Sequence, residues 1–433
     1  CKEVEGEIQN FNISVMITDE FMDAVINKDF DKVMSTTQDG KAITVGELWK
    51  EITEHAWRNG EPGVLFYDTI NADSTVPKLG KMVATNPCSE LPLLPYESCT
   101  LGSINLAKFV YDRPYDMQEN LTDFKKYFDE VAFSHAVRSG VRFLDSVVSK
   151  NDFPLKELKE MAEKTRKIGL GLMGVHDAMI RLNIPYDSDM ACKFVYYVMN
   201  LLTEVAFETS FKLAEEKGIC PAFDDKFTFP AAHKALHGIR HFYPYYNMYC
   251  EEHGLRNANL TTIAPTGTIS LLADCSSGIE PVFSYIYKRT NVVGKSYDKI
   301  IHPLFKKCIE DNFPDEKDRE FIFEHMYSTG SIQDLTDLIP ERIRAVYKTA
   351  LDVSPEWHVT IQSEFQKWVM SSISKTINMP ESATVEDIAN VIKDAYTKGC
   401  KGLTIYRTNS RQNVVLNLGD KKKEAEEAKA EDV

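Results

Sequence analysis

Long apolar runs are missing from this sequence: no stretch approaches the roughly eighteen consecutive hydrophobic residues that mark a membrane-spanning helix. A basic segment followed by an apolar one, the pattern of a secretory signal, is also absent from its start. The sequence therefore predicts a cytoplasmic protein with no membrane contact.

Cysteine pairing motifs are missing too. None of the nine cysteines stands in a Cys-x-x-Cys pair or at a regular spacing. This pattern argues against a zinc module and against the disulfide framework of a small secreted protein. We expect most of these cysteines to be buried thiols and none to be a metal ligand.

Positive charge is scarce. Lysine and arginine number 50 against 65 aspartates and glutamates, so the formal net charge is -15. This balance opposes affinity for a nucleic-acid backbone, and no nucleic-acid partner is expected. An anionic ligand must therefore be held locally by backbone amides and a few cations. With 433 residues, 43% of them hydrophobic, the chain can form one large α/β domain or two ordinary ones.

Apolar residues recur at helical spacing in three segments: residues 44–60, a long region from Thr122, and a segment that ends at Gly218. Residues 10–15 and 63–68 have the length and composition of short strands. The apolar stripes that we expect in the core are Val137, Val141, Leu144 and Val148 in one helix and Phe194, Val198, Leu201 and Val205 in the next.

The clearest topology is in the C-terminal third. Residues 372–379 and 402–406 are predicted strands, and the helix between them opens with a capping box from Thr384 to Asp387 and stops at Gly399. This is a βαβ unit. Because parallel strands joined by helices need a covered sheet or a closed barrel, the predicted class is α/β.

One short stretch combines a thiol, an amide and a carboxylate between prolines, which predicts a loop tip. It consists of Asn86, Pro87, Cys88, Ser89 and Glu90. In an extended loop alternate side chains point the same way, so the amide, thiol and carboxylate can face one ligand. The carboxylate can take a proton from a hydroxyl that the amide holds, and the sulfur can act as a nucleophile or one-electron centre. The alternative is a buried cysteine beside an ordinary turn.

Cys99 follows eleven residues after Cys88, in Glu-Ser-Cys-Thr-Leu-Gly-Ser-Ile-Asn. Together the two stretches resemble the finger loop of ribonucleotide reductases, here residues 84–100, and above all that of the adenosylcobalamin-dependent class. The resemblance implies part of the ten-stranded α/β barrel of these enzymes, with the finger loop threaded through its centre.

The resemblance also implies a reaction: reduction of ribonucleotides to 2′-deoxyribonucleotides for DNA synthesis and repair. Cys88 would become a thiyl radical and remove the ribose 3′ hydrogen, Glu90 would take the 3′-hydroxyl proton, and Asn86 would hydrogen-bond the sugar. Cys99 would supply electrons by forming a disulfide with a cysteine in a preceding part of the enzyme. A thioredoxin-like or glutaredoxin-like protein would reduce that disulfide, although the tail of this chain has no Cys-x-x-Cys to relay the electrons.

A second constellation lies at residues 259–270, where a β-branched run breaks at Pro-Thr-Gly-Thr into a helix start. Free N–H groups and the positive helix end can cradle an anion, and Gly267 lets the backbone come close. The pattern alone is a weak signal. It also resembles the substrate-phosphate loop of the reductases, at residues 262–281 of this chain, with the turn at 276–281 behind it. By that resemblance the residues that bind the nucleotide phosphates are Pro265, Thr266, Gly267, Thr268 and Ile269.

Two other patterns have plainer explanations. Gly169-Leu-Gly-Leu-Met-Gly174 fits the dinucleotide-binding pattern G-x-G-x-x-G, but the strand before it is scarcely more than Lys167-Ile168, and a Lys- and Glu-rich helix precedes it. The reductase resemblance gives these glycines a close-packing role. His233, His237 and His241 could share a helical face, but metal binding would need a further ligand, so a solvated segment is predicted.

The strand at residues 401–407 bears on the source of the radical. Reductases with a separate diiron subunit carry two adjacent tyrosines in this strand, whereas in this chain Ile405 stands in place of one, beside Tyr406. This favours a radical made next to Cys88 with adenosylcobalamin as cofactor. Glycyl-radical reductases are disfavoured because no C-terminal glycyl motif is visible. Two alternatives stay open. One is a reductase class with a separate radical subunit, and the other is a nucleotide-binding fragment without catalysis.

The chain starts at Cys1 and not at methionine, so we expect a fragment, with an intein junction as the alternative. By the resemblance, residues 1–418 are the C-terminal portion of the reductase barrel. Residues 419–433 are expected to be a charged flexible tail. The expected partners are the ribonucleotide substrate, the N-terminal part of the same enzyme and a second copy in a homodimer. The chain alone is expected to be inactive.

Overall fold

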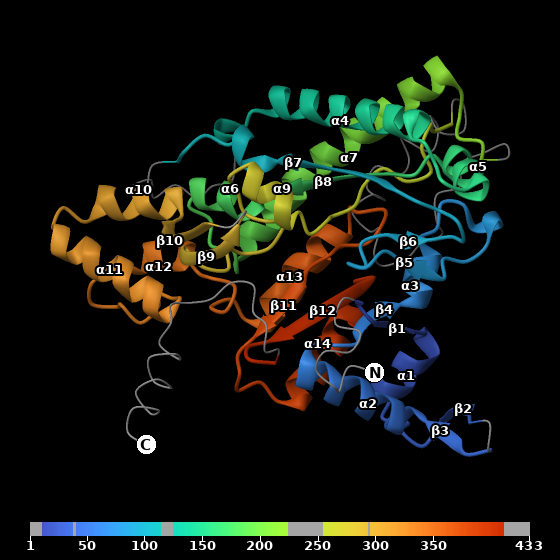
Figure 1. The fold of residues 1–433 in the computed structure, drawn as a ribbon, viewed down its shortest axis with the longest axis horizontal. Coiled ribbons are helices and arrows are strands. Elements are labelled where there is room, and N and C mark those ends of the chain that lie inside the picture. Colours follow the sequence, from blue (N-terminus) through green and yellow to red (C-terminus); the bar gives the residue numbers. More distant parts are fainter. Residues whose placement is uncertain (1–10, 38–39, 114–123, 224–253, 293–294, 411–433) are drawn as a thin grey trace.

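The computed structural model describes residues 11–37, 40–113, 124–223, 254–292 and 295–410. Helices and strands are interspersed along these ranges, which confirms the α/β prediction (Figure 1). No helix in these ranges is long and apolar enough to span a membrane.

Short strands alternate with longer helices along the chain. The helices are α1 Asp19–Ile26, α2 Val45–Asn59, α3 Tyr67–Ala72, α4 Glu130–Lys150, α5 Lys156–Thr165, α6 Val175–Arg181, α7 Asp189–Lys217, α9 Gly267–Leu272, α10 Pro303–Asn312, α11 Glu316–Thr329, α12 Glu341–Val346, α13 Pro355–Gln366 and α14 Val385–Thr397. The strands are β1 Ser14–Ile17, β2 Val33–Thr36, β3 Ala42–Thr44, β4 Gly63–Phe66, β5 Ala84–Thr85, β6 Pro92–Leu93, β7 Thr100–Asn105, β8 Ile168–Met173, β9 Ile286–Val292, β10 Lys295–Ile301, β11 Thr376–Met379 and β12 Gly402–Arg407.

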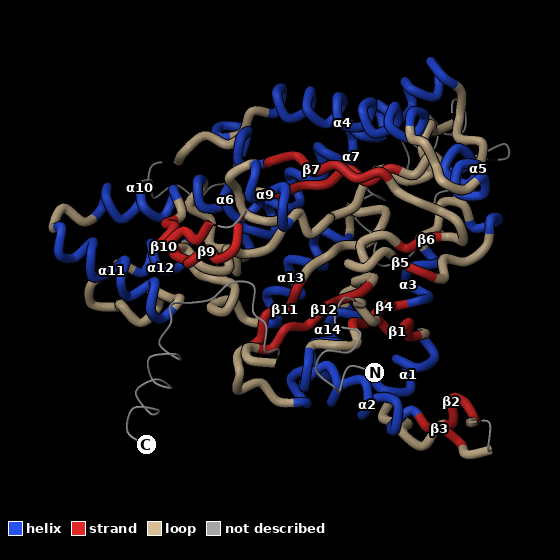
Figure 2. The backbone as a smooth tube through the Cα atoms, in the orientation of Figure 1, coloured by secondary structure: helices blue, strands red, loops and turns tan. Residues whose placement is uncertain are grey.

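Two groups of strands form the centre of the fold (Figure 2). One sheet has the order β1-β4-β12-β11, in which only the β4–β12 pair is antiparallel. The other group is the parallel pair β7–β8. Single parallel bridges run from Leu170 to Thr261 and from Ile263 to Ile373, so the segment before α9 lies between β8 and the approach to β11. Among the described residues these strands do not close into a barrel.

The predicted C-terminal βαβ unit is confirmed. Strands β11 and β12 pair in parallel, and α14 between them opens with the capping box of Thr384 and Asp387. Strand β11 begins at Thr376 and not at residue 372. The reason is that the backbone N–H groups before this point bond outside the β11–β12 pair. The Ser372 N–H donates to the Glu90 carbonyl, and the Ser374 N–H donates to the Ile263 carbonyl.

The other predicted helices are also present. Helix α2 opens with a capping box at Thr44 and ends at Gly60, which has the left-handed φ of +76°. Helix α7 ends before Gly218, as predicted. Thr122 lies outside the described residues, and α4 begins after Asp129, whose carboxylate accepts a hydrogen bond from the first turn. Local capping chemistry therefore decided these ends.

Strand positions were predicted less well than helices. Strand β4 lies within the predicted 63–68 range and is fully buried. Strand β1 starts at Ser14 and not at residue 10. The predicted histidine segment 233–241 and the tail 419–433 lie outside the described residues.

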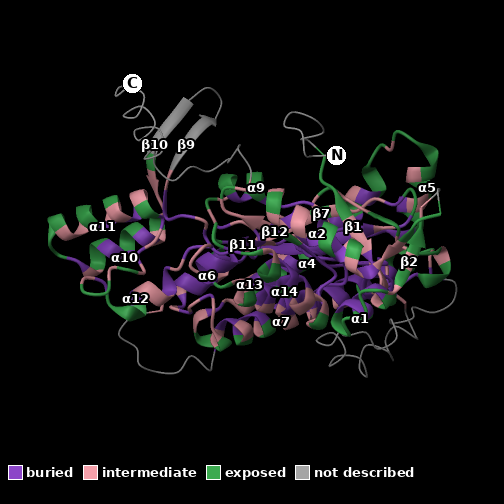
Figure 3. Cartoon of the chain, turned by 90° about the horizontal axis from the view of Figure 1, so that it is seen from below, coloured by how far each residue is buried: buried purple, intermediate pink, exposed green. Residues whose placement is uncertain are grey.

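The core has three parts. In the largest, α4 and α7 pack against β7 and β8, and it contains all of the predicted apolar stripes, with only Leu201 half-buried. In the second, α1, α2 and α14 cover the β4–β12 sheet. The third lies among α10, α11 and α12 at one end of the molecule (Figure 1). Figure 3 shows these buried residues concentrated along the middle of the fold, with exposed residues on the outer helices.

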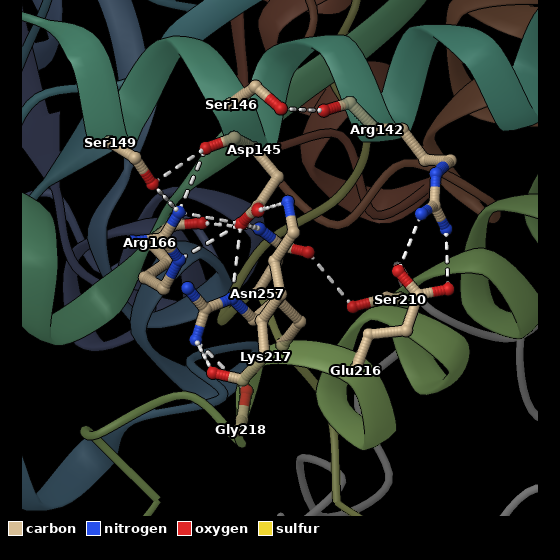
Figure 4. A network of polar contacts seen from close by, with 11 residues as sticks. Arg142, Asp145, Ser146, Ser149, Arg166, Ser210, Glu216, Lys217, Gly218 and Asn257 are labelled. Carbon is tan, nitrogen blue, oxygen red and sulfur yellow. Dashed lines mark hydrogen bonds and ion pairs between the residues drawn. The ribbon is translucent and has the colours of Figure 1, made fainter.

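A buried carboxylate joins three of the outer helices (Figure 4). Asp145 on α4 is fully buried and pairs with Arg166 at 2.7 Å, Lys217 at 3.3 Å and Arg256 at 3.4 Å, while the Asn257 amide donates to it. Burial alone would raise the pKa of the Asp145 carboxyl, but hydrogen bonds and charge from Arg166, with Arg256 and Lys217, hold it below its usual value. The network fixes the chain where it enters β8.

Gly169 and Gly171 lie within β8, and Gly174 follows the strand as the N-cap of α6, so the first two glycines do not form a dinucleotide turn. The predicted strand of two residues was too short, because β8 includes these two glycines. A Cβ atom on Gly171 would stand 2.1 Å from the Thr262 carbonyl oxygen, and one on Gly169 would stand 2.5 Å from the Thr262 methyl group. The predicted close-packing role is confirmed.

Candidate active site

Residues 86–91 form the tip of a short hairpin between β5 and β6. The Ser89 N–H donates to the Asn86 carbonyl at 3.1 Å, and the Leu91 N–H donates to Asn86 Oδ1 at 3.0 Å. Ser89 takes the left-handed φ of +67°. The predicted loop tip is confirmed, but the predicted extended backbone is wrong, because these hydrogen bonds curl the segment into a turn.

The turn still brings the predicted trio together. The Asn86 side chain lies close enough to the Glu90 carboxylate to lower its pKa, and the charge of Glu90 acts on the Cys88 thiol. Glu90 is only 2% exposed, whereas Cys88 is half-exposed. Among the described residues, Glu90 Oε2 is buried and has no hydrogen-bond partner. A buried acceptor of this kind is costly unless a ligand satisfies it, and a hydroxyl group is a suitable donor.

Both ionisable groups have pKa values above their usual ones. Burial raises the pKa of the Glu90 carboxyl, partly offset by the nearby Asn86 side chain. Burial, and then the charge of Glu90, raises the pKa of the Cys88 thiol. The sulfur is therefore an S–H group at neutral pH, and Glu90 is a stronger base than an exposed glutamate.

Distant segments hold the tip in place. The Glu90 carbonyl accepts from the Ser372 N–H at 3.0 Å and from Thr262 Oγ1 at 2.9 Å. The Asn12 amide donates to the Pro87 carbonyl at 2.8 Å. Sequence reasoning missed these three supports, because none is near the tip in the chain. Thr262 belongs to the predicted phosphate loop, but nothing in that pattern indicates a contact with the finger loop.

Cys99 lies directly before β7 and is half-buried. A Cβ atom on Gly169 would stand 3.3 Å from its sulfur, so the absence of a side chain there leaves room for the thiol. Burial raises the pKa of Cys99 to about 12, with Glu97 and Glu90 adding to the rise and Lys167 opposing it. The thiol is thus protonated at neutral pH.

The predicted phosphate loop continues from the segment that supports the finger loop, since Thr262 belongs to both. Helix α9 begins at Gly267, and the left-handed φ of +55° is at Thr266 and not at the glycine. A Cβ atom on Gly267 would meet nothing within 4 Å, so open space lies before this backbone. Thr268 and Ile269 are exposed beside it.

The turn at residues 276–281 lies behind this loop, as predicted. The Gly278 N–H donates to Thr266 Oγ1 at 2.7 Å, and the Ser270 and Ser277 hydroxyls are 2.8 Å apart. Pro265 is half-buried and Thr266 is buried. The hydroxyl of Thr266 is therefore used within the protein, which leaves backbone N–H groups and Thr268 for a ligand.

A profile described as "Ribonucleotide reductase, barrel domain" matches residues 1–406. The chain belongs to the ribonucleotide reductase family. A vitamin B12-dependent ribonucleoside-diphosphate reductase of Thermoplasma acidophilum is 37% identical over 429 residues, and one of Mycobacterium tuberculosis is 37% identical over 420. Each match covers 96% of this chain but 50% and 54% of the relative, so the chain spans about half the length of these curated reductases.

A solved structure shows the same fold. The alpha subunit of the Actinobacillus ureae class Id ribonucleotide reductase matches with a TM-score of 0.67 and 22% identity, over 92% of this chain and 65% of that one. The family profile confirms the predicted family, and this match confirms the predicted reductase fold, although no closed barrel is formed among the described residues. The alpha subunit of a Chlamydia muridarum ribonucleoside-diphosphate reductase is 27% identical over 406 residues, covering 88% of this chain and 36% of that subunit. Both relatives at 37% identity are named vitamin B12-dependent reductases.

Proposed function

We propose that this chain is the catalytic portion of an adenosylcobalamin-dependent reductase that converts ribonucleotides to 2′-deoxyribonucleotides for DNA synthesis and repair. The observation that carries the proposal is the buried Glu90 Oε2, which lacks a protein partner among the described residues beside Asn86 and a protonated Cys88. A ribose 3′-hydroxyl supplies the missing donor and places its carbon near the sulfur.

The proposed residue roles are those that the resemblance to the reductases implies. Glu90 accepts the 3′-hydroxyl proton, Asn86 hydrogen-bonds the sugar, and the Cys88 sulfur exchanges a hydrogen atom with C3′. The sugar loses its 2′-hydroxyl as water and receives two electrons and two protons from two thiols, which end as a disulfide. Cys99 is one of these thiols, and a cysteine in a preceding part of the enzyme is the other.

The proposed cofactor is adenosylcobalamin, because the relatives at 37% identity are named vitamin B12-dependent. When bound, it supplies the one-electron chemistry that starts the reaction. The chain fits this cofactor in one respect: Cys88 is half-exposed and carries its hydrogen, so it can be reached and can give up a hydrogen atom. In the described part of the chain no group of three His, Cys, Asp or Glu residues could hold a metal, and a cobalt that arrives within its own corrin ring needs none.

The experiment that tests the proposal is a reduction assay on the enzyme that contains this chain together with the preceding part of the reductase. We expect deoxyribonucleotide formation that depends on adenosylcobalamin and not on an added diiron subunit. Activity that required a diiron protein would overturn the assignment of class. Substrate binding without any product, in the presence of cofactor and a dithiol, would favour the alternative of a nucleotide-binding module.

Replacement of Gly267 by valine is expected to raise the substrate KM about tenfold or more. A branched side chain would fill the open space before α9 and remove at least one amide–phosphate hydrogen bond, worth about 1.5–3 kcal/mol. Steady-state kinetics would measure this change. The thermal midpoint serves as the control, because the Cβ atom of the new side chain meets no protein atom within 4 Å. An unchanged KM would move the phosphate site elsewhere.

Several expectations about partners, location and phosphate-binding residues stay predictions. They are a homodimer, a thioredoxin-like or glutaredoxin-like reductant, a cytoplasmic location, and roles for Pro265, Thr266, Thr268 and Ile269 in phosphate binding. The boundary between the barrel portion at 1–418 and the tail at 419–433 is likewise a prediction.

A further inference from the structure

Two buried ion pairs lie behind the hairpin that carries the active-site tip. Lys167 pairs with Glu97 at 3.1 Å, and Lys401 pairs with Asp73 at 3.2 Å, with every one of these side chains at most 3% exposed. All four line one small buried cavity. Burying four charges is expensive, so their presence beside a reactive loop calls for an explanation beyond stability.

Lys167 holds the returning arm of the finger loop at two points. Its Nζ donates to the Pro92 carbonyl at 2.7 Å and to Glu97 Oε2 at 3.1 Å. The same carboxylate oxygen accepts from the Leu94 N–H at 3.0 Å. The lysine thereby braces the segment that leads from β6 to Cys99.

Lys167 is also the neighbour of Cys99 in the sheet. Strands β7 and β8 are parallel, and their register pairs Thr100 with Ile168, so the residues just before them lie side by side. The charged groups that act on the thiol are Lys167 on one side and Glu97 and Glu90 on the other. Lys167 is the cation among them.

We propose that Lys167 is a positioning residue that sets the reactivity of the Cys99 thiol, and that Glu97 is the counter-charge that restrains it. The assignment of Cys99 as a redox thiol rests on the proposed function, but the effect of Lys167 on the thiol does not. Because disulfide formation removes the thiol proton, a nearby cation favours the step and a nearby carboxylate opposes it.

The test measures the rate at which iodoacetamide alkylates Cys99 between about pH 7 and 9. The full enzyme is used without substrate, and peptide mass spectrometry follows the modification of Cys99. Lys167→Met is expected to slow the reaction and Glu97→Gln to speed it. A shift of about one pKa unit changes the thiolate population about tenfold. Because a more basic thiolate is also more nucleophilic, the net change expected at fixed pH is about threefold in each direction.

Opposite changes in the alkylation rate of the two single variants distinguish this role from a purely structural support of the loop. Both substitutions break the same ion pair, so if the pair only braces the loop both should change the rate in the same direction. Lys167→Arg keeps the charge and should leave the rate within about twofold. Lys167→Met combined with Glu97→Gln leaves no unpaired charge, so it keeps the test available if a single variant fails to fold, and its rate should lie between those of the singles.

Two controls complete the experiment. Cys192 on α7 is half-exposed and outside this cluster, so its alkylation rate provides an internal reference. Lys375→Met removes an equally buried lysine, paired with Glu280, and should not change the rate at Cys99. Equal signs for the two single variants, or a double variant outside their range, would overturn the proposal. Neither result would bear on whether the enzyme reduces ribonucleotides, which the cofactor assay decides.

Discussion

Cys88→Ser is expected to abolish deoxyribonucleotide formation and hydrogen exchange at the substrate 3′ carbon together. The Cys88 thiol carries its hydrogen at neutral pH, and an S–H bond is weak enough to be opened and re-formed during each turnover. A serine O–H bond is too strong to replace it. Release of tritium from 3′-tritiated substrate, measured beside product formation in the full enzyme with adenosylcobalamin, checks the prediction.

Folding is the main alternative cause of such a loss. If Cys88 were only a packed thiol, the substitution would cost about 1–3 kcal/mol of stability and leave substantial activity in the folded fraction. Cys192→Ser is the matched control, because Cys192 is also half-exposed and lies on α7. It should retain full activity. An active Cys88→Ser enzyme would contradict the central assignment of the site.

Cys99→Ser is expected to separate the two halves of the reaction. The thiol lies at the start of β7, outside the turn that holds Asn86, Cys88 and Glu90, so removal of its sulfur should leave hydrogen abstraction intact. Deoxyribonucleotide formation should fail because one of the two electron-donating thiols is missing. Tritium release from the 3′ position, or loss of the base from a stalled sugar, should persist.

The control for Cys99→Ser is the Cys88→Ser enzyme in the same assay, which should release no tritium. Loss of both product and tritium release in the Cys99 variant would place this thiol in the first step and contradict its assignment as the redox thiol. Normal product formation would show that the electrons come from elsewhere.

The sequence alone determined the features that depend on neighbours within a few residues. Thr384 was assigned as a helix cap because a capping box needs only a hydroxyl and a carboxylate three residues apart. The reactive trio was assigned for a similar reason, since Asn86, Cys88 and Glu90 stand within five residues of one another. The resemblance to the family, and with it the predicted fold, rested on the same short sequence motifs.

The tertiary structure decided the features that depend on segments far apart in the chain. Sequence reasoning gave the trio an extended backbone, whereas hydrogen bonds within the tip curl it, and Thr262 and Ser372 hold it from more than a hundred residues away. The resemblance predicted a close-packing role for the glycines of β8, and only the tertiary structure shows which atoms they pack against.

The electrostatics of the site also came only from the tertiary structure. A lysine directly before an apolar strand, as in Lys167-Ile168, is the one local signal that could have suggested a buried cation. Its partners, Glu97 and the Pro92 carbonyl, lie about seventy residues earlier. The burial that raises the pKa of Glu90 and Cys88 is likewise a property of the packed chain, because desolvation depends on every segment that surrounds a group and not on its neighbours in sequence.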